Sequence, residues 1–114
     1  MNRTPDAEVI LRLLPTTDGG KANPVLSGYR PHYAIHSDYL TSVNHELLDD
    51  LAIHPGGQGR VNVWFITPEQ YPNTLWIGRE IAVSEGSKVV GSALVVSVFN
   101  ATLLGDSPPT TTLG

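Results

Sequence analysis

The sequence predicts an all-β protein, a small closed antiparallel β-barrel of about six strands. Eleven glycines and nine prolines divide the 114 residues into short segments. The apolar segments between these breaks are rich in Val, Ile, Tyr and Trp, residue types that suit a half-buried pleated surface. Closure into a barrel would leave few strand edges free to pair with another chain.

Five segments have the pattern of strands, and a sixth is weaker. The five are Ala7 to Leu14, Tyr33 to Ser37, Arg60 to Thr67, Glu80 to Ser84 and Lys88 to Phe99. The weaker strand is expected from Leu47 to Ile53. A short helix from Val43 to Leu51 stays open as an alternative, because Leu47, Leu48 and Leu51 recur at helical spacing.

Two local patterns refine this prediction. Along the segment from Arg60, apolar side chains occur on both alternating faces, which is typical of a strand with neighbours on each side. One face holds Val61, Val63 and Phe65, and the other holds Asn62, Trp64 and Ile66. The segment Ser84-Glu85-Gly86-Ser87-Lys88 predicts a hairpin, because Gly86 can take a positive φ between two apolar runs.

Length and charge restrict the class of protein. A chain of 114 residues suits one domain, and a charged fraction of 16% is too low for a disordered polyelectrolyte. Seven basic residues against eleven acidic ones disfavour non-specific nucleic-acid binding, and no DNA partner is expected. Without cysteine, disulfides and thiolate chemistry are excluded. Because no apolar leader or spanning segment occurs, we expect a soluble, cytoplasmic protein without membrane contact.

The chain is expected to hold one domain between two flexible ends. Residues 1–6 are interpreted as a flexible N-terminus, residues 7–101 as the barrel domain and residues 102–114 as a flexible tail. From Gly105 onward the sequence contains Pro108-Pro109 and a run of threonines, which has no core-forming pattern.

No signature of catalysis or metal binding is present, so we expect neither enzymatic activity nor a cofactor. The glycines before Lys21 are not followed by the Ser or Thr of a phosphate-binding loop. On a strand, His32 and His36 would lie about 13 Å apart, too far to share a metal ion. His36, Ser37 and Asp38 are consecutive, so they point to alternating faces instead of forming a catalytic triad.

Two separated segments resemble a known family. The first runs from Asp18 to Pro31 and reads DGGKANPVLSGYRP, and the second runs from Ile81 to Gly91 and reads IAVSEGSKVVG. Together they are similar to the third, C-terminal β-barrel domain of bacterial elongation factor Tu. The similarity extends from Ala7 to about Asn100 in the family's order and spacing. It implies a stand-alone third-domain barrel with no GTPase domain before it.

In that family the barrel packs beside two other domains and holds the T stem of aminoacyl-tRNA. The resemblance therefore assigns RNA-binding or partner-binding roles to Lys21, His32, Thr41, Glu85, Gly86 and Lys88. The family often has histidine where this chain has Ala22, lysine where it has Thr67 and arginine where it has Ser84, and each lost cation removes a charge-assisted phosphate contact. Trp76 is a further candidate, either as part of the core or as an exposed binding surface.

The first hypothesis is a non-catalytic binding module that docks a protein partner, either a translation factor or a protein that recognises elongation factor Tu. The alternative is weak binding of tRNA or other structured RNA through the remaining family surface. A salt titration separates the two, because phosphate contacts weaken steeply with salt whereas an apolar protein interface does not. A small-ligand pocket or an unrecognised enzymatic site is the third alternative.

Overall fold

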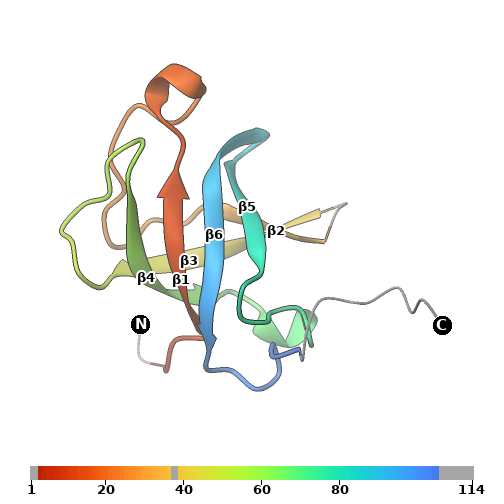
Figure 1. Ribbon diagram of the computed structural model, residues 1–114. Coiled ribbons are helices and arrows are strands. Elements are labelled where there is room, and N and C mark those ends of the chain that lie inside the picture. The colour runs from red at the N-terminus through yellow and green to blue at the C-terminus, as the bar shows by residue number, and fades with distance from the viewer. Residues whose placement is uncertain (1–2, 37–38, 106–114) are drawn as a thin grey trace.

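The structure, a computed structural model, describes residues 3–36 and 39–105. Six antiparallel strands close into a barrel in the order β1-β4-β3-β2-β5-β6 (Figure 1). The strands are β1 (Ala7–Leu13), β2 (His32–His36), β3 (Tyr39–Leu47), β4 (Gln58–Phe65), β5 (Glu80–Glu85) and β6 (Lys88–Val98). Two short 3-10 turns, η1 (Thr16–Asp18) and η2 (Pro68–Gln70), lie in the connections. The prediction of a small closed antiparallel barrel is confirmed.

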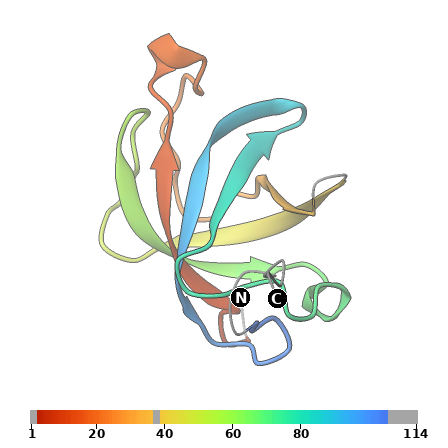
Figure 2. The same cartoon turned by 45° about the vertical axis from the view of Figure 1, so that its right-hand side comes forward.

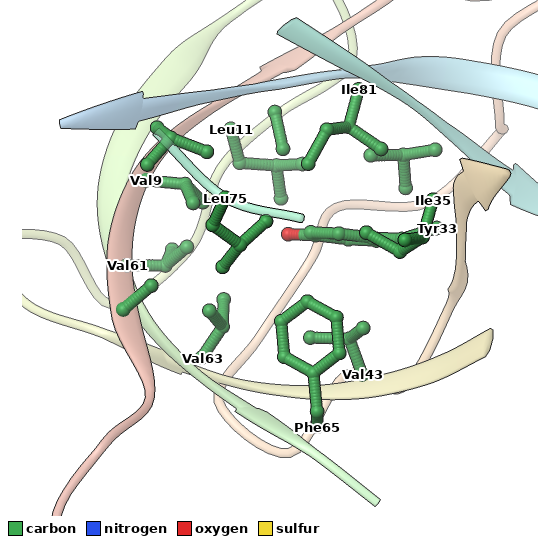
Figure 3. Close-up of a cluster of buried hydrophobic side chains, with 14 of the residues drawn as sticks. Val9, Leu11, Tyr33, Ile35, Val43, Val61, Val63, Phe65, Leu75 and Ile81 are labelled. Atoms are coloured by element: carbon green, nitrogen blue, oxygen red, sulfur yellow. The ribbon is translucent and has the colours of Figure 1, made fainter. Parts of the chain in front are cut away.

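The core lies inside the barrel. Inward and outward positions alternate along each strand, so each strand contributes one row of side chains to the interior. Side chains of all six strands converge there with Leu75 of the loop before β5; Figure 3 labels those of β1 to β5. The largest are Tyr33 and Phe65, which are fully buried and meet edge to face with ring centroids 6.1 Å apart. This continuous apolar interior holds the six strands together.

Five of the predicted strands are confirmed to within two residues at their described ends. The segment from Arg60 lies in β4, which pairs with β1 on one side and β3 on the other, as its two apolar faces predicted. The predicted hairpin is also confirmed, since Glu85 pairs with Lys88 and Gly86 has a φ of 61°. The predicted strand end at Ser37 lies outside the described residues.

The strand β3 is the element that sequence reasoning missed. The predicted strand from Leu47 to Ile53 is wrong, because the strand ends at Leu47 and only Ile53 bridges another segment. The alternative helix from Val43 to Leu51 is wrong as well. The interior row of β3 contains the polar residues Thr41 and His45, both buried. These polar side chains interrupt the apolar alternation by which a strand is recognised.

The N-terminal segment described in the structure is held against the barrel. Asp6 is 1% exposed, and its carboxylate accepts hydrogen bonds from the Phe65 backbone N–H at 2.7 Å and from Asn100 Nδ2 at 2.9 Å. Arg3 forms an ion pair with the same carboxylate at 2.7 Å, and its carbonyl accepts a hydrogen bond from the Trp64 indole. Residues 3–6, expected to be a flexible N-terminus, therefore make buried polar contacts.

The first residues of the expected C-terminal tail also contact the barrel. Leu103 is fully buried and joins the core cluster. Leu104 forms a parallel bridge with Leu75, and the Gly105 N–H donates to the Leu75 carbonyl at 2.7 Å. The rest of the expected tail, residues 106–114, lies outside the described residues.

Candidate functional site

Several residues singled out by the family resemblance meet at one end of the barrel. At this end β5 turns into β6 beside η1 (Figure 2). We call the group Lys21, Tyr29, Glu85 and Lys88 the charged end. Lys21 Nζ lies 3.9 Å from the Glu85 carboxylate and 5.6 Å from the centroid of the Tyr29 ring. Lys88 Nζ donates to the Gly20 carbonyl at 3.1 Å, so residues far apart in sequence form one cluster.

The positive charges of the charged end are satisfied by groups of the protein itself. Tyr29 donates its hydroxyl proton to Glu85 at 2.7 Å. Burial, followed by this hydrogen bond and the Glu85 charge, raises the pKa of Tyr29 far above its usual value, so the phenol remains a donor. Lys21 also donates to the Asn23 carbonyl at 2.6 Å, and its side chain is only 13% exposed. The Glu85 carboxylate, 3.9 Å from Lys21 Nζ and more exposed than it, would repel a phosphate that approaches Lys21.

The hairpin turn sets the positions of these groups. Gly86 adopts a left-handed conformation, and Glu85 and Lys88 face each other as cross-strand partners on either side of the turn. A Cβ at Gly86 would meet no atom within 4 Å. Gly86 therefore contributes backbone geometry, which only glycine adopts without strain, and its sides are open.

His32 lies beside the charged end. Across the β2–β5 pair it is opposite Ser84, a neighbour that sequence reasoning did not identify. Among the described residues, neither the buried His32 Nδ1 nor the buried Ser84 Oγ has a hydrogen-bond partner. Such groups are costly and rare. Ser84 is 5% exposed, so an external group would reach this pair only if the strands moved apart. Ser84 was noted only for a missing cation, because its pairing with His32 depends on the register of β2 against β5.

The structure does not bring Thr41 to this surface. Thr41 is opposite Tyr33 in the β2–β3 pair and is 6% exposed. It belongs to the interior row of β3, with Val43 and His45. Contact between Thr41 and an external partner would require the barrel to open.

A buried tyrosine–histidine pair supports the charged end from inside. The Tyr33 hydroxyl lies 2.6 Å from His45 Nε2, and His45 Nδ1 lies 3.2 Å from the carbonyls of Tyr29 and Val43. Because carbonyls only accept, we assign the imidazole proton to Nδ1, and Nε2 accepts from Tyr33. Burial lowers the pKa of His45 to about 4 despite these backbone contacts. The imidazole is therefore neutral in the folded protein.

This buried histidine predicts that the protein loses stability as the pH falls. In the unfolded chain His45 titrates near 6.5, whereas in the folded protein it titrates near about 4. Between these values the unfolded state binds the extra proton, so acid favours unfolding. The contribution of neutral His45 to the free energy of unfolding is complete above pH 6.5, the pKa of the unfolded chain, and it is lost as the pH falls to about 4. At about 1.4 kcal/mol per pH unit, the loss amounts to about 3 kcal/mol.

Urea unfolding at several pH values measures this effect, with His45→Gln as the control. Glutamine offers a donor and an acceptor but does not titrate in this range. The unfolding free energy of the wild type should therefore fall more steeply between pH 7 and pH 4 than that of the variant. Parallel losses in the two proteins would show that other groups cause the acid sensitivity.

Trp76 lies away from the charged end. It is located before β5, whereas Glu85 closes β5, so the length of this strand separates them by about 20 Å. Trp76 is half-buried and lines a hollow of about 230 Å³. The Arg79 guanidinium packs on its ring, 4.9 Å from the centroid. Trp76 is thus neither a core residue nor a fully exposed one.

Within the parts of the chain that the structure describes, no three His, Asp or Glu side chains gather closely enough to hold a metal ion. No helix in those parts combines the length and apolar character needed to cross a bilayer. No model of a known protein family matches the chain. The structure defines a small closed antiparallel barrel whose charged end consists of internally paired groups.

Proposed function

We propose that the protein is a non-catalytic binding module that docks a protein partner through the charged end of the barrel. The pairing of Lys21 with Glu85 is the observation that supports this most directly. A nucleic-acid site gains its affinity from cations that neutralise phosphates. At the charged end, those cations are already engaged, and the second lysine, Lys88, is held by the Gly20 carbonyl.

The other basic side chains follow the same trend. In the described part of the chain, six of the seven contact a carboxylate or carbonyl of the protein: Arg3, Arg12, Lys21, Arg60, Arg79 and Lys88. Arg60 is the most extensively paired, with Asp49 at 2.9 Å and Glu8 at 3.1 Å. The four that pair with carboxylates, Arg3, Arg12, Lys21 and Arg60, contribute little positive potential for a polyanion, and the net charge of −4 lowers it further.

Exposed apolar side chains next to the charged end suit a protein partner. Leu26 is 57% exposed, and its carbonyl accepts a hydrogen bond from the Tyr29 N–H. Val89, which follows Lys88, is 50% exposed. Protein interfaces combine an apolar core with a polar rim. The proposal includes a cytoplasmic partner that is a translation factor or recognises elongation factor Tu, in keeping with the resemblance of the sequence to that family's third domain.

Weak binding of structured RNA is the second candidate. The observation that favours it is that Lys21 and Lys88 lie at the same end of the barrel. Phosphate oxygens would accept hydrogen bonds from both ammonium groups. This candidate predicts contacts that depend on Lys21 and Lys88 and therefore on salt.

The test captures partners from cell lysate with the purified protein, with and without nuclease, and then measures the affinity of the captured protein by calorimetry. We expect one protein to be captured equally well with and without nuclease treatment. Val89→Glu should weaken its affinity at least about tenfold, because a charge then enters an apolar contact. Ile66→Glu is the matched control, since Ile66 is 49% exposed but follows β4 at the other end of the barrel.

A parallel titration with bulk tRNA tests the second candidate. Binding that weakens by orders of magnitude between about 50 and 200 mM salt and depends on Lys88 would replace the docking proposal. Protein capture that is equally sensitive to Val89→Glu and Ile66→Glu would reject the charged end as the docking surface. Retention of neither protein nor RNA would count against both functions.

A further inference from the structure

The strands β2 and β5 diverge at the end of the barrel opposite the charged end. They pair at only two positions, His32 with Ser84 and Tyr33 with Val83. Beyond these pairs, Arg79 spans the gap, and its guanidinium donates to the Ile35 carbonyl at 2.6 Å. The hollow of about 230 Å³ lies at this point, so we call it the Arg79 hollow. The Arg79 side chain thus donates a hydrogen bond to β2 at a point where the backbone hydrogen bonds between β2 and β5 have ended.

Arg79 resembles Lys88 in that its hydrogen-bond partners are neutral carbonyls, but Arg79 is half-buried whereas Lys88 is exposed. Its guanidinium donates to the carbonyls of Ile35 and Thr74, whereas no carboxylate lies within ion-pair distance among residues 3–36 and 39–105. The side chain is half-buried, and this burial lowers the pKa of Arg79. A partly desolvated cation without a counter-charge is under-stabilised, and an anion in the hollow would correct this.

The geometry of the hollow restricts what the anion can be. A guanidinium has five N–H groups, and two carbonyl contacts leave further donors for a planar, fork-shaped carboxylate. A volume of about 230 Å³ is below the range of about 300–1,000 Å³ that is usual for small-molecule and cofactor sites. The hollow therefore has room for one side chain rather than for a nucleotide.

The surroundings favour a side chain that belongs to a protein segment. Trp76 and Pro72 line the hollow and can pack against methylene groups. Ile77, next to Trp76, is 71% exposed, and Leu104, bridged to Leu75, is 45% exposed. Apolar residues that flank an acidic one in a partner segment would cover these side chains.

We propose that the Arg79 hollow binds the carboxylate of a glutamate or aspartate side chain in an apolar segment of a partner protein. Arg79 holds the carboxylate, and Trp76 and Pro72 contact the methylene groups that carry it. The site lies at the far end of β5 from the charged end, so this inference does not depend on docking there.

The test uses the two tryptophan indole N–H signals in a ¹⁵N-correlation spectrum of the intact protein. The probe is acetyl-leucyl-glutamyl-leucine amide, and its glutamine counterpart is the neutral control. We expect a saturable shift of the Trp76 signal with the glutamate peptide and binding at least about tenfold weaker with the glutamine peptide. The Trp64 indole, which donates to the Arg3 carbonyl, should not move and reports on the integrity of the fold.

Arg79→Gln should abolish the response, whereas Arg12→Gln should preserve it. Arg12→Gln is a matched control because it removes the same charge, but from an exposed ion pair with Glu80. If Arg79→Gln does not fold, the comparison of the two peptides on the wild type decides the matter. Equal binding of the two peptides would overturn the inference, and so would an equal response of Trp76 to inorganic phosphate. Neither result would affect the test based on Val89.

Discussion

Replacing Gly91 with alanine should destabilise the protein by about 3 kcal/mol or prevent folding. Gly91 lies opposite Leu13 where β6 pairs with β1. A Cβ at Gly91 would lie 2.1 Å from the Arg12 carbonyl oxygen and 3.2 Å from the Leu13 Cα, both backbone atoms. The two strands cannot separate locally, because β1 is also fixed to β4 on its other side. The added methyl group therefore disrupts barrel closure itself.

Thermal and urea unfolding measure this loss, and Gly86→Ala is the matched control. Both glycines belong to the β5–β6 hairpin, but a Cβ at Gly86 would meet open space. Gly86→Ala should lower the free energy of unfolding by only about 1 kcal/mol, since alanine in the left-handed region is mildly strained. Similar losses for the two variants would mean that the approach of β1 to β6 at Gly91 does not limit stability.

Replacing Asp6 with alanine is the second change with a large expected effect, a loss of about 3 kcal/mol. The Asp6 carboxylate satisfies the buried Phe65 N–H, the Asn100 amide and the Arg3 guanidinium. Alanine leaves the Phe65 N–H buried without an acceptor, and such an orphan donor carries the full cost of its desolvation. Asp6 thus links the start of the chain to β4 and to the segment after β6.

Asp49→Ala is the control for this prediction. Asp49 is a carboxylate of the same type in an ion pair with Arg60 at 2.9 Å, but the pair lies at the surface. Exposed ion pairs contribute little to stability, so the unfolding midpoint of this variant should stay near that of the wild type. An equal effect of Asp6→Ala and Asp49→Ala would disprove the importance of the buried carboxylate network.

Much of the fold was predictable because strands and turns depend on local pattern. The alternation along Arg60 to Thr67 and the glycine between two apolar runs predicted β4 and the β5–β6 hairpin, and both are confirmed. The strand β3 was missed because Thr41 and His45 occupy interior positions. Their polar atoms are compatible with the interior only where other groups hydrogen-bond to them, as Tyr33 does to His45.

The candidate site was predictable only in part. The resemblance pointed to Lys21, Glu85 and Lys88, which the structure brings to one end of the barrel. It could not show that Lys21 is paired with Glu85, or that Thr41 faces the interior. Neither could it reveal the pairing of His32 with Ser84. These relations depend on strand register, which a single sequence does not specify for strands far apart in the chain.

The sequence by itself determined the strand-forming segments, the hairpin at Gly86 and a surface poor in free positive charge, because these depend on local propensity and composition. Tertiary structure alone decided which charges are neutralised and which remain without a counter-charge. Barrel closure brings Tyr29 to Glu85 and separates Arg79 from any carboxylate of the described chain. The physical reason is that ion pairs and hydrogen bonds form between neighbours in space, and the six-strand order sets those neighbours.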